Sequence, residues 1–104
     1  MAPALVNPAR GEVALVFDGV TRTLCLTLGA LAEIEAAFGA KSLDDLADRL
    51  KALSAADFIV VLTALLRGGG EPLSAEDVAA APVDLNAAAQ AVGEALRLSL
   101  SDRP

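Results

Sequence analysis

The sequence contains no histidine, tryptophan or tyrosine, and it has a single cysteine and three phenylalanines. Without histidine, the chain lacks the commonest metal ligand and the commonest general base of enzymes. The lone Cys25 excludes a disulfide within the chain. Because no histidine can activate Cys25 and it falls within a predicted strand, we interpret it as an inert small residue. We therefore predict a protein that is not an enzyme and has no cofactor or metal site.

Basic residues are also scarce, with 8 Lys and Arg against 14 Asp and Glu, a formal net charge of −6. This balance disfavours binding to nucleic acids and to anionic membranes, both of which require clustered basic side chains. No apolar run approaches the ~20 residues that span a bilayer. The first residues, MAPALVNPARGEV, lack the basic and apolar regions of a secretory signal. We expect a cytoplasmic protein.

The acidic residues that lie close together are better explained as surface charge than as sites. Asp44, Asp45 and Asp48 fall on one predicted helix, whereas a calcium site needs oxygen ligands from an irregular, glycine-containing loop. Glu33 and Glu35 are two residues apart on another predicted helix, so their carboxylates do not face each other. Neither group is expected to perform catalysis.

The chain is rich in aliphatic and small residues, and 55% of its 104 residues are hydrophobic. Its length fits a single domain over residues 1–104. The most apolar stretch is SAADFIVVLTALLRGGG, residues 54–70. Ser54 and Asp57 can cap a helix at its start, and the three glycines can end it. Because this helix is apolar nearly all round, it must be enclosed by neighbours or partly covered by a partner.

The N-terminal part predicts a β-hairpin over residues 11–27, after a flexible arm of residues 1–9. Asp18-Gly19 between alternating apolar residues favours a type I′ turn. A two-residue turn pairs Phe17 with Val20 and places one apolar face on the helices. That face comprises Val13, Leu15, Phe17, Val20, Leu24 and Leu26, with Arg22 as the one polar exception.

Residues 28–99 predict about five helices, and residues 100–104 a frayed tail. Cap signals at Thr27, Ser42, Ser54, Ser74 and Asp84 mark the starts of the five helices. The predicted helices cover residues 28–38, 43 to about 53, 55 to the glycines, 75–80 and 85 to about 98. Their apolar stripes include Leu28, Leu43 and Leu85, the first residue of three helices. The fold class is therefore α+β: a hairpin packed on a helical bundle, with helix dominant.

The loop Arg67-Gly68-Gly69-Gly70 has two interpretations that remain open. Three glycines can cradle a phosphate, but the loop follows a helix and lacks the phosphate-binding pattern, so we reject that function. A helix end with Arg67 beside the negative end of the helix dipole is one interpretation. A contact loop for a protein partner is the other.

Several segments in order resemble one small family: residues 7–13 (NPARGEV), Asp18-Gly19, residues 26–35 (LTLGALAEIE) and residues 65–70 (LLRGGG). This is the gene transfer agent family of short phage-tail proteins of alphaproteobacteria, whose members are described as tail tube proteins and as tail assembly chaperones. The resemblance implies a role in building the tail of a phage-like particle. It also implies, as one function, a chaperone that keeps the helical tape measure protein soluble until tube subunits replace it.

One hairpin and five helices fit a chaperone better than a tube subunit, which usually contributes a large β-sheet to a ring. The partners implied are the tape measure protein, the major tail tube protein or both, and self-association stays open. We expect an apolar client helix in a groove between the central and last helices. The candidate contacts are Leu62, Leu66, Val92 and Leu96 as walls, with Arg67 at the rim. Gly68, Gly69 and Gly70 are further candidates for contact with the partner. The alternative is that the wall residues are simply core.

Overall fold

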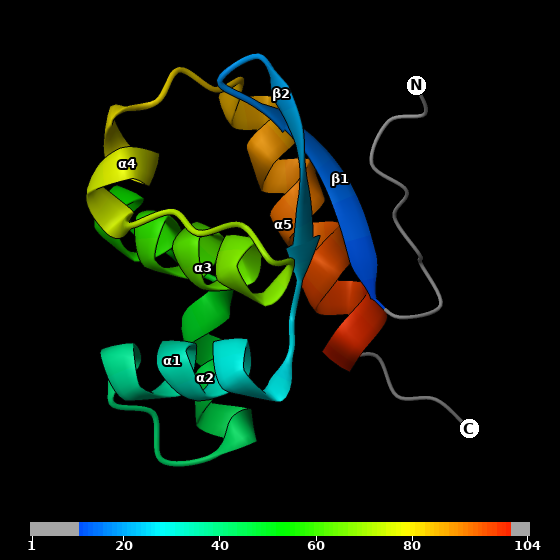
Figure 1. Cartoon of the computed structure of the whole chain (residues 1–104). Helices are drawn as coiled ribbons and strands as arrows, with labels where there is room; N and C mark the ends of the chain where they lie inside the picture. The colour runs from blue at the N-terminus through cyan, green and yellow to red at the C-terminus, as the bar shows by residue number, and fades with distance from the viewer. Residues whose placement is uncertain (1–10, 101–104) are drawn as a thin grey trace.

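The computed structural model describes residues 11–100, and it describes side chains over residues 11–98. The elements are β1 (Glu12–Phe17), β2 (Val20–Cys25), α1 (Leu28–Phe38), α2 (Leu43–Leu50), α3 (Ala55–Gly68), α4 (Ala75–Ala80) and α5 (Leu85–Leu100). Figure 1 shows the hairpin on one side of a set of helices. The predicted α+β class with helix dominant is confirmed. The predicted arm, residues 1–9, and residues 101–104 of the predicted tail lie outside the described residues, whereas Leu100 belongs to α5.

The hairpin has the predicted turn and register. Asp18 and Gly19 both have positive φ, 57° and 76°, as a type I′ turn requires. Phe17 pairs with Val20, and the pairing continues in step to Glu12 with Cys25. Leu15, Phe17 and Leu24 are buried on the helix side, whereas Val20, at the turn, is half exposed. The hydrophobic alternation thus fixes which face of the hairpin meets the helices.

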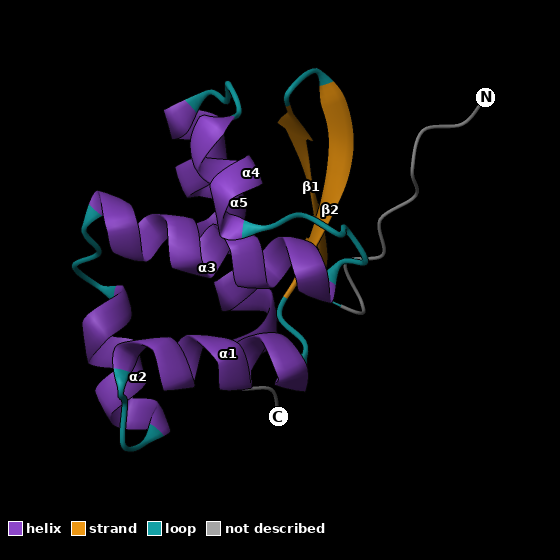
Figure 2. Cartoon of the chain, turned by 60° about the vertical axis from the view of Figure 1, so that its left-hand side comes forward, coloured by secondary structure: helices purple, strands orange, loops and turns teal. Residues whose placement is uncertain are grey.

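Helix α3 is the centre of the core, as its apolar composition predicts. Six consecutive residues, 61–66, are buried, so this part of the helix is enclosed on every side. Helix α1 packs along it from one side, and α4, α5 and β2 pack on the others. Figure 2 shows α1 running alongside α3, with the hairpin at the other end of the molecule from α2. Thr63, the one buried polar residue of the described part, donates its hydroxyl hydrogen to the Ile59 carbonyl.

Side-chain caps are present at all five predicted helix starts. Thr27, Ser42, Ser54 and Ser74 each accept a hydrogen bond from a backbone N–H three residues on. Asp84 accepts one from the Asn86 N–H, two residues on. Helix α2 ends at Leu50, three residues before the predicted end near Leu53. Lys51 still has helical backbone angles, whereas Ser54 is extended because it caps α3. The chain therefore leaves the helical conformation between these two residues.

The prediction that Leu28, Leu43 and Leu85 lie on buried helix faces is wrong. Their exposed fractions are 85%, 56% and 73%. Each is the first residue of its helix. The buried positions come later in each helix, such as Ile34, six residues after Leu28, and Leu46, three residues after Leu43.

Glycine is needed at the three positions after Arg67 for two different structural reasons. Gly68 and Gly69 allow the end of α3 to lie directly against the outer edge of β2. A Cβ atom on Gly68 would lie 2.0 Å from the Cys25 carbonyl oxygen, and one on Gly69 would lie 2.0 Å from the Thr23 carbonyl oxygen. Only glycine allows this approach. Gly70 has φ +90°, and a Cβ atom added to it would meet no heavy atom within 4 Å, so it serves the turn itself.

Residues 71–84 form a strap that carries α4 back across α3 and is tied to the hairpin at both ends. At one end, the Arg22 guanidinium donates to Glu71 Oε1 at 2.9 Å and the Thr23 N–H donates to Glu71 Oε2 at 3.2 Å. At the other end, the Asp18 N–H donates to the Pro82 carbonyl. Arg22, the polar exception of the hairpin face, is therefore explained by its ion pair with Glu71.

Candidate partner-binding site

An apolar groove lies where the first turns of α3 and α5 meet α4. It has a volume of about 620 Å³. The residues that line it are Leu53, Ser54, Ala55, Phe58, Ile59, Leu62, Val78, Ala79, Ala81, Pro82, Val83, Leu85 and Ala89. Ser54 is the single polar residue among them, so this surface suits an apolar ligand.

Three segments position the groove. Helix α3 supplies its floor, because Phe58, Ile59 and Leu62 recur at a helical spacing along one face. Helix α4 forms one wall and is anchored by Val78, which is buried against α3. Leu85, at the first position of α5, stands on the rim with 73% of its surface exposed. The groove is therefore built on helices that the core holds in place.

The structure assigns most of the predicted wall residues to the core. Leu66 and Val92 are 0% and 3% exposed and belong to the hydrophobic core, which agrees with the alternative that they are core residues. Leu96 is half-buried and packs against the core cluster. Leu62, which is 2% exposed, is the one predicted wall residue that also lines the observed groove, at its floor. Contact of these residues with a partner stays a prediction.

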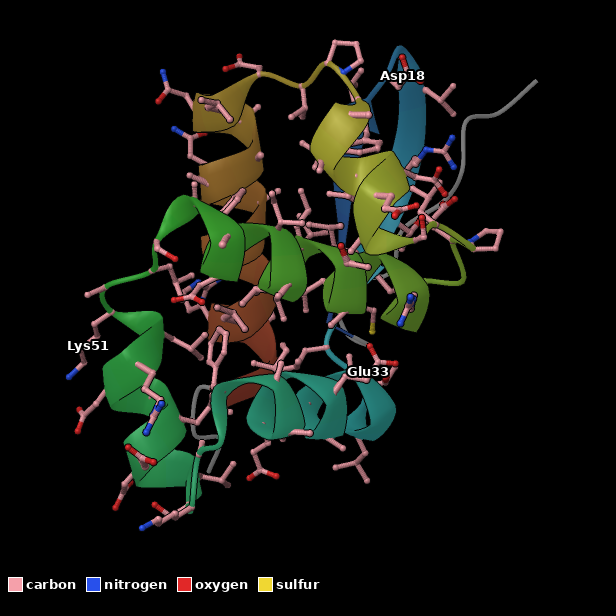
Figure 3. All side chains as sticks on the ribbon, turned by 90° about the vertical axis from the view of Figure 1, so that its left-hand side faces the viewer. Asp18, Glu33 and Lys51 are labelled. Atoms are coloured by element: carbon pink, nitrogen blue, oxygen red, sulfur yellow. The ribbon has the colours of Figure 1, made fainter. Side chains whose placement is uncertain are left out.

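Arg67 and the glycines lie at the other end of α3 from the groove. The Arg67 guanidinium reaches the Leu73 carbonyl at 3.3 Å and Glu33 Oε1 at 3.4 Å. Figure 3 labels Glu33 on α1 beneath the last turns of α3, whereas Lys51 lies beside the start of α3. Arg67 thus joins α1, α3 and the strap on an exposed surface. This arrangement agrees with the helix-end interpretation of the glycine loop, and its role toward a partner stays a prediction.

The carboxylates with shifted pKa values lie at helix caps and surface ion pairs. The Lys41 N–H and then Arg49 lower the pKa of Asp45, and the Ser74 N–H and hydroxyl lower the pKa of Asp77. Arg97 lowers the pKa of Glu94. Each shift favours the charged form and is explained by local stabilisation. Within residues 11–98, no group of three or more metal-ligating side chains occurs.

Cys25 is buried although the hairpin alternation places it on the outer face. The last turn of α3 covers it, because Gly68 lies against the Cys25 carbonyl. Among the helices of the described chain, none combines the length and the hydropathy needed to cross a membrane.

Sequence reasoning missed most of the residues of the groove. The apolar pattern gives Phe58 and Ile59 no distinct face of their helix, and it places Leu53 at the end of α2. A usable signal is the composition of the strap, where Ala81, Pro82 and Val83 form an apolar segment outside any helix. Apolar residues that gather at a surface are typical of an interaction site.

Comparison with curated proteins and with solved structures gives no match. A comparison with protein-family models gives a match over residues 10–102 to the family described as "Phage tail tube protein, GTA-gp10". The match spans both strands and all five described helices, and it agrees with the resemblance seen in the sequence. The chain is therefore a member of this family of phage and gene transfer agent tail proteins.

Proposed function

We propose that this protein is a non-catalytic tail assembly chaperone that binds an apolar helix of the tape measure protein. The observation that carries the proposal is the groove, which combines about 620 Å³ with a lining of aliphatic and aromatic side chains. A helix laid in such a groove buries one apolar stripe without needing charged contacts. The protein would act in the bacterial cytoplasm and associate transiently with assembling tails.

The groove is preferred over the other apolar surfaces because an exposed leucine and half-buried apolar side chains line the same hollow. Leu85 on the rim adjoins Phe58 and Ile59 on the floor, so a client side chain can enter between them. Leu28 and Leu43 are also exposed, but neither lines the groove. Scattered single apolar residues are normal on protein surfaces, whereas an apolar hollow is typical of a binding site.

The test replaces Leu85 with Glu and measures whether the tape measure protein still co-purifies from cells that produce both. A carboxylate at the first position of a helix favours the helix and places charge on the groove rim. We expect Leu85→Glu to lose the tape measure protein while its free energy of unfolding changes by less than about 0.5 kcal/mol. Binding by the natural sequence should persist in about 1 M salt, since apolar contacts are not screened.

Leu28→Glu is the matched control, because Leu28 is also an exposed leucine at the first position of a helix. It should keep the tape measure protein bound. If both variants keep the client, or if 1 M salt releases it from the natural protein, the groove is not the binding site. The same assay with the major tail tube protein tests that protein as the client.

The second candidate function is a structural tail tube subunit, which the family description favours. The described residues hold a two-stranded sheet, whereas a tube wall usually needs a large sheet that closes across subunits. Particle composition separates the two functions. A subunit is present in purified particles at the stoichiometry of a ring, and a chaperone is absent from them.

A further inference from the structure

The two outer edges of the hairpin differ in whether residues outside the hairpin contact their outward backbone groups. In an antiparallel pair, residues alternate between exchanging hydrogen bonds with their partner and pointing their N–H and C=O groups outward. Phe17 and Val20 flank the two-residue turn and exchange bonds, so the groups of Thr23 point outward from β2. Glu71 accepts from the Thr23 N–H, and Gly69 lies against the Thr23 carbonyl. The edge of β2 is therefore closed at Thr23 by its own chain.

The same alternation directs the N–H and C=O groups of Ala14 and Val16 outward from β1. Over the described residues, these groups have no protein hydrogen-bond partner. Both side chains are exposed, and 61% of the Val16 surface is open to solvent. Figure 1 shows β1 along the outer right-hand side of the described chain. Further along, the edge is closed at Asp18, whose N–H donates to the Pro82 carbonyl.

The sequence of β1, EVALVF, has no lysine and no proline, two devices that prevent edge pairing, and its one charged residue, Glu12, is at its first position. Its register with β2 is continuous, so it has no bulge either. A hairpin of two strands is also short of the three that usually make a sheet independently stable. An unprotected edge with these properties favours the addition of another strand.

We propose that the edge of β1 pairs with β1 of a second copy of this chain, giving an antiparallel four-stranded sheet across a two-fold axis. With the axis at Leu15, Ala14 lies opposite Val16 of the second copy, and the two pairs exchange four backbone hydrogen bonds. The exposed Val16 then packs beside Ala14 of the second copy on the outer face. On the inner face, Leu15 meets its own counterpart.

A second copy fits this edge because identical antiparallel strands are automatically self-complementary. The register also limits like-charge contacts to Glu12 with Asp18 of the second copy, a contact that the two-fold axis repeats at each end of the paired segment. Raised salt screens that repulsion, so the dimer should persist or strengthen in about 0.5 M salt. This surface is separate from the groove and does not depend on the proposed client.

The first test is the mass of the protein in solution, measured by analytical ultracentrifugation at rising concentration. The natural chain should approach twice its mass of 10.5 kDa. Ala14→Pro should abolish the dimer, because proline removes an outward N–H while leaving the hairpin's own ladder intact. Thr21→Pro is the matched control, since its N–H also points outward but from β2, and it should still dimerise.

Hydrogen exchange on the natural chain gives a second measurement that needs no variant to fold. The amides of Ala14 and Val16 should exchange more slowly as the concentration rises, whereas the Thr21 amide should not change. A mass of 10.5 kDa at every concentration up to the solubility limit would overturn the proposal. So would a dimer that leaves both edge amides unprotected, one that dissociates in raised salt, or one that survives Ala14→Pro.

Disulfide formation tests the register in a Cys25→Ala background. Residues in a hydrogen-bonded antiparallel pair have Cα atoms about 5.5 Å apart, within disulfide range. A mixture of the Ala14→Cys and Val16→Cys proteins should form a covalent dimer, and neither should do so alone. Self-linking of Ala14→Cys alone would contradict the register. The Leu85→Glu variant should still dimerise, so a failed client test and a failed dimer test are distinguishable.

Discussion

The two halves of helix α3 have the same kind of composition but different surroundings. The second half, from Val61 to Leu66, is buried on every side, and its last turn lies against the backbone of β2. The first half, with Phe58 and Ile59, is half-buried and lines the groove. One helix thus holds the fold together at one end and leaves an apolar surface open at the other.

This difference shows that an apolar sequence predicts that a helix is buried. It does not predict whether the same chain or a partner covers the helix. Helix α3 contacts four elements of its own chain, and the side chains of its buried second half are constrained in size and shape. The first half has α4 and α5 on one side and open space in the groove. A partner can cover the apolar surface of the first half there without changing the packing of the enclosed half.

The largest expected effect comes from filling the closest contact of the enclosed end. Gly69→Ala places a Cβ atom 2.0 Å from the Thr23 carbonyl oxygen, where backbone must move. We expect the free energy of unfolding, measured by denaturant titration, to fall by about 3 kcal/mol. Gly70→Ala should cost about 1 kcal/mol, because its conflict is only the positive φ.

Gly93→Ala is the control for the glycine series. Gly93 lies in α5 with no heavy atom within 4 Å of an added Cβ. The substitution should raise stability by about 0.5 kcal/mol, since alanine favours helix over glycine. Equal losses at Gly69 and Gly70 would mean that φ, and not the approach to β2, governs this loop.

Truncating one side chain in each half of α3 tests the comparison directly. Leu66→Ala leaves a cavity in the fully enclosed part, and we expect a loss of about 3 kcal/mol. Ile59→Ala removes a half-buried side chain that faces the groove, so the loss should be about 1 kcal/mol. A loss at Ile59 as large as that at Leu66 would show that the first half is core as well.

The tie between the strap and the hairpin should have a smaller effect. Glu71→Gln keeps the shape of the side chain but removes the charge that pairs with Arg22, and both side chains are mostly buried, with 21% and 23% exposed. We expect a loss of about 1 kcal/mol. Glu94→Gln removes an exposed pair with Arg97 and should leave the denaturation midpoint unchanged.

The smallest effect concerns the cap of α4, which supports one wall of the groove. Hydrogen bonds from the Ser74 N–H and hydroxyl lower the pKa of Asp77 below its ordinary 3.8. A lowered pKa means that the charged form stabilises the folded state above pH 3.8, and that this contribution is lost as the pH falls below that value. The stability difference between the natural protein and Asp77→Asn should therefore shrink at low pH. A difference that stays constant across this range would show that the carboxylate charge does not matter.

Local signals predicted the elements and the hairpin register well. The Asp18-Gly19 turn fixed the pairing of Phe17 with Val20, and the side-chain caps fixed the helix starts, because each depends on residues close in sequence. The groove was predicted between α3 and α5, and the observed groove shares Leu62 with the predicted walls. Leu66 and Val92 satisfy the same apolar pattern as Phe58, so the pattern alone could not say which would be covered.

The sequence by itself determined the secondary structure, the hairpin face and the apolar character of α3, since these follow from turn chemistry, caps and periodicity. Only the tertiary structure decided which end of α3 is enclosed, which edge of the hairpin is closed and why Gly68 and Gly69 are glycines. The contacts responsible join Thr23 to Glu71 and Gly69, and Asp18 to Pro82, all of them far apart along the chain. Such long-range packing depends on how the elements meet in space, and no local pattern carries that information.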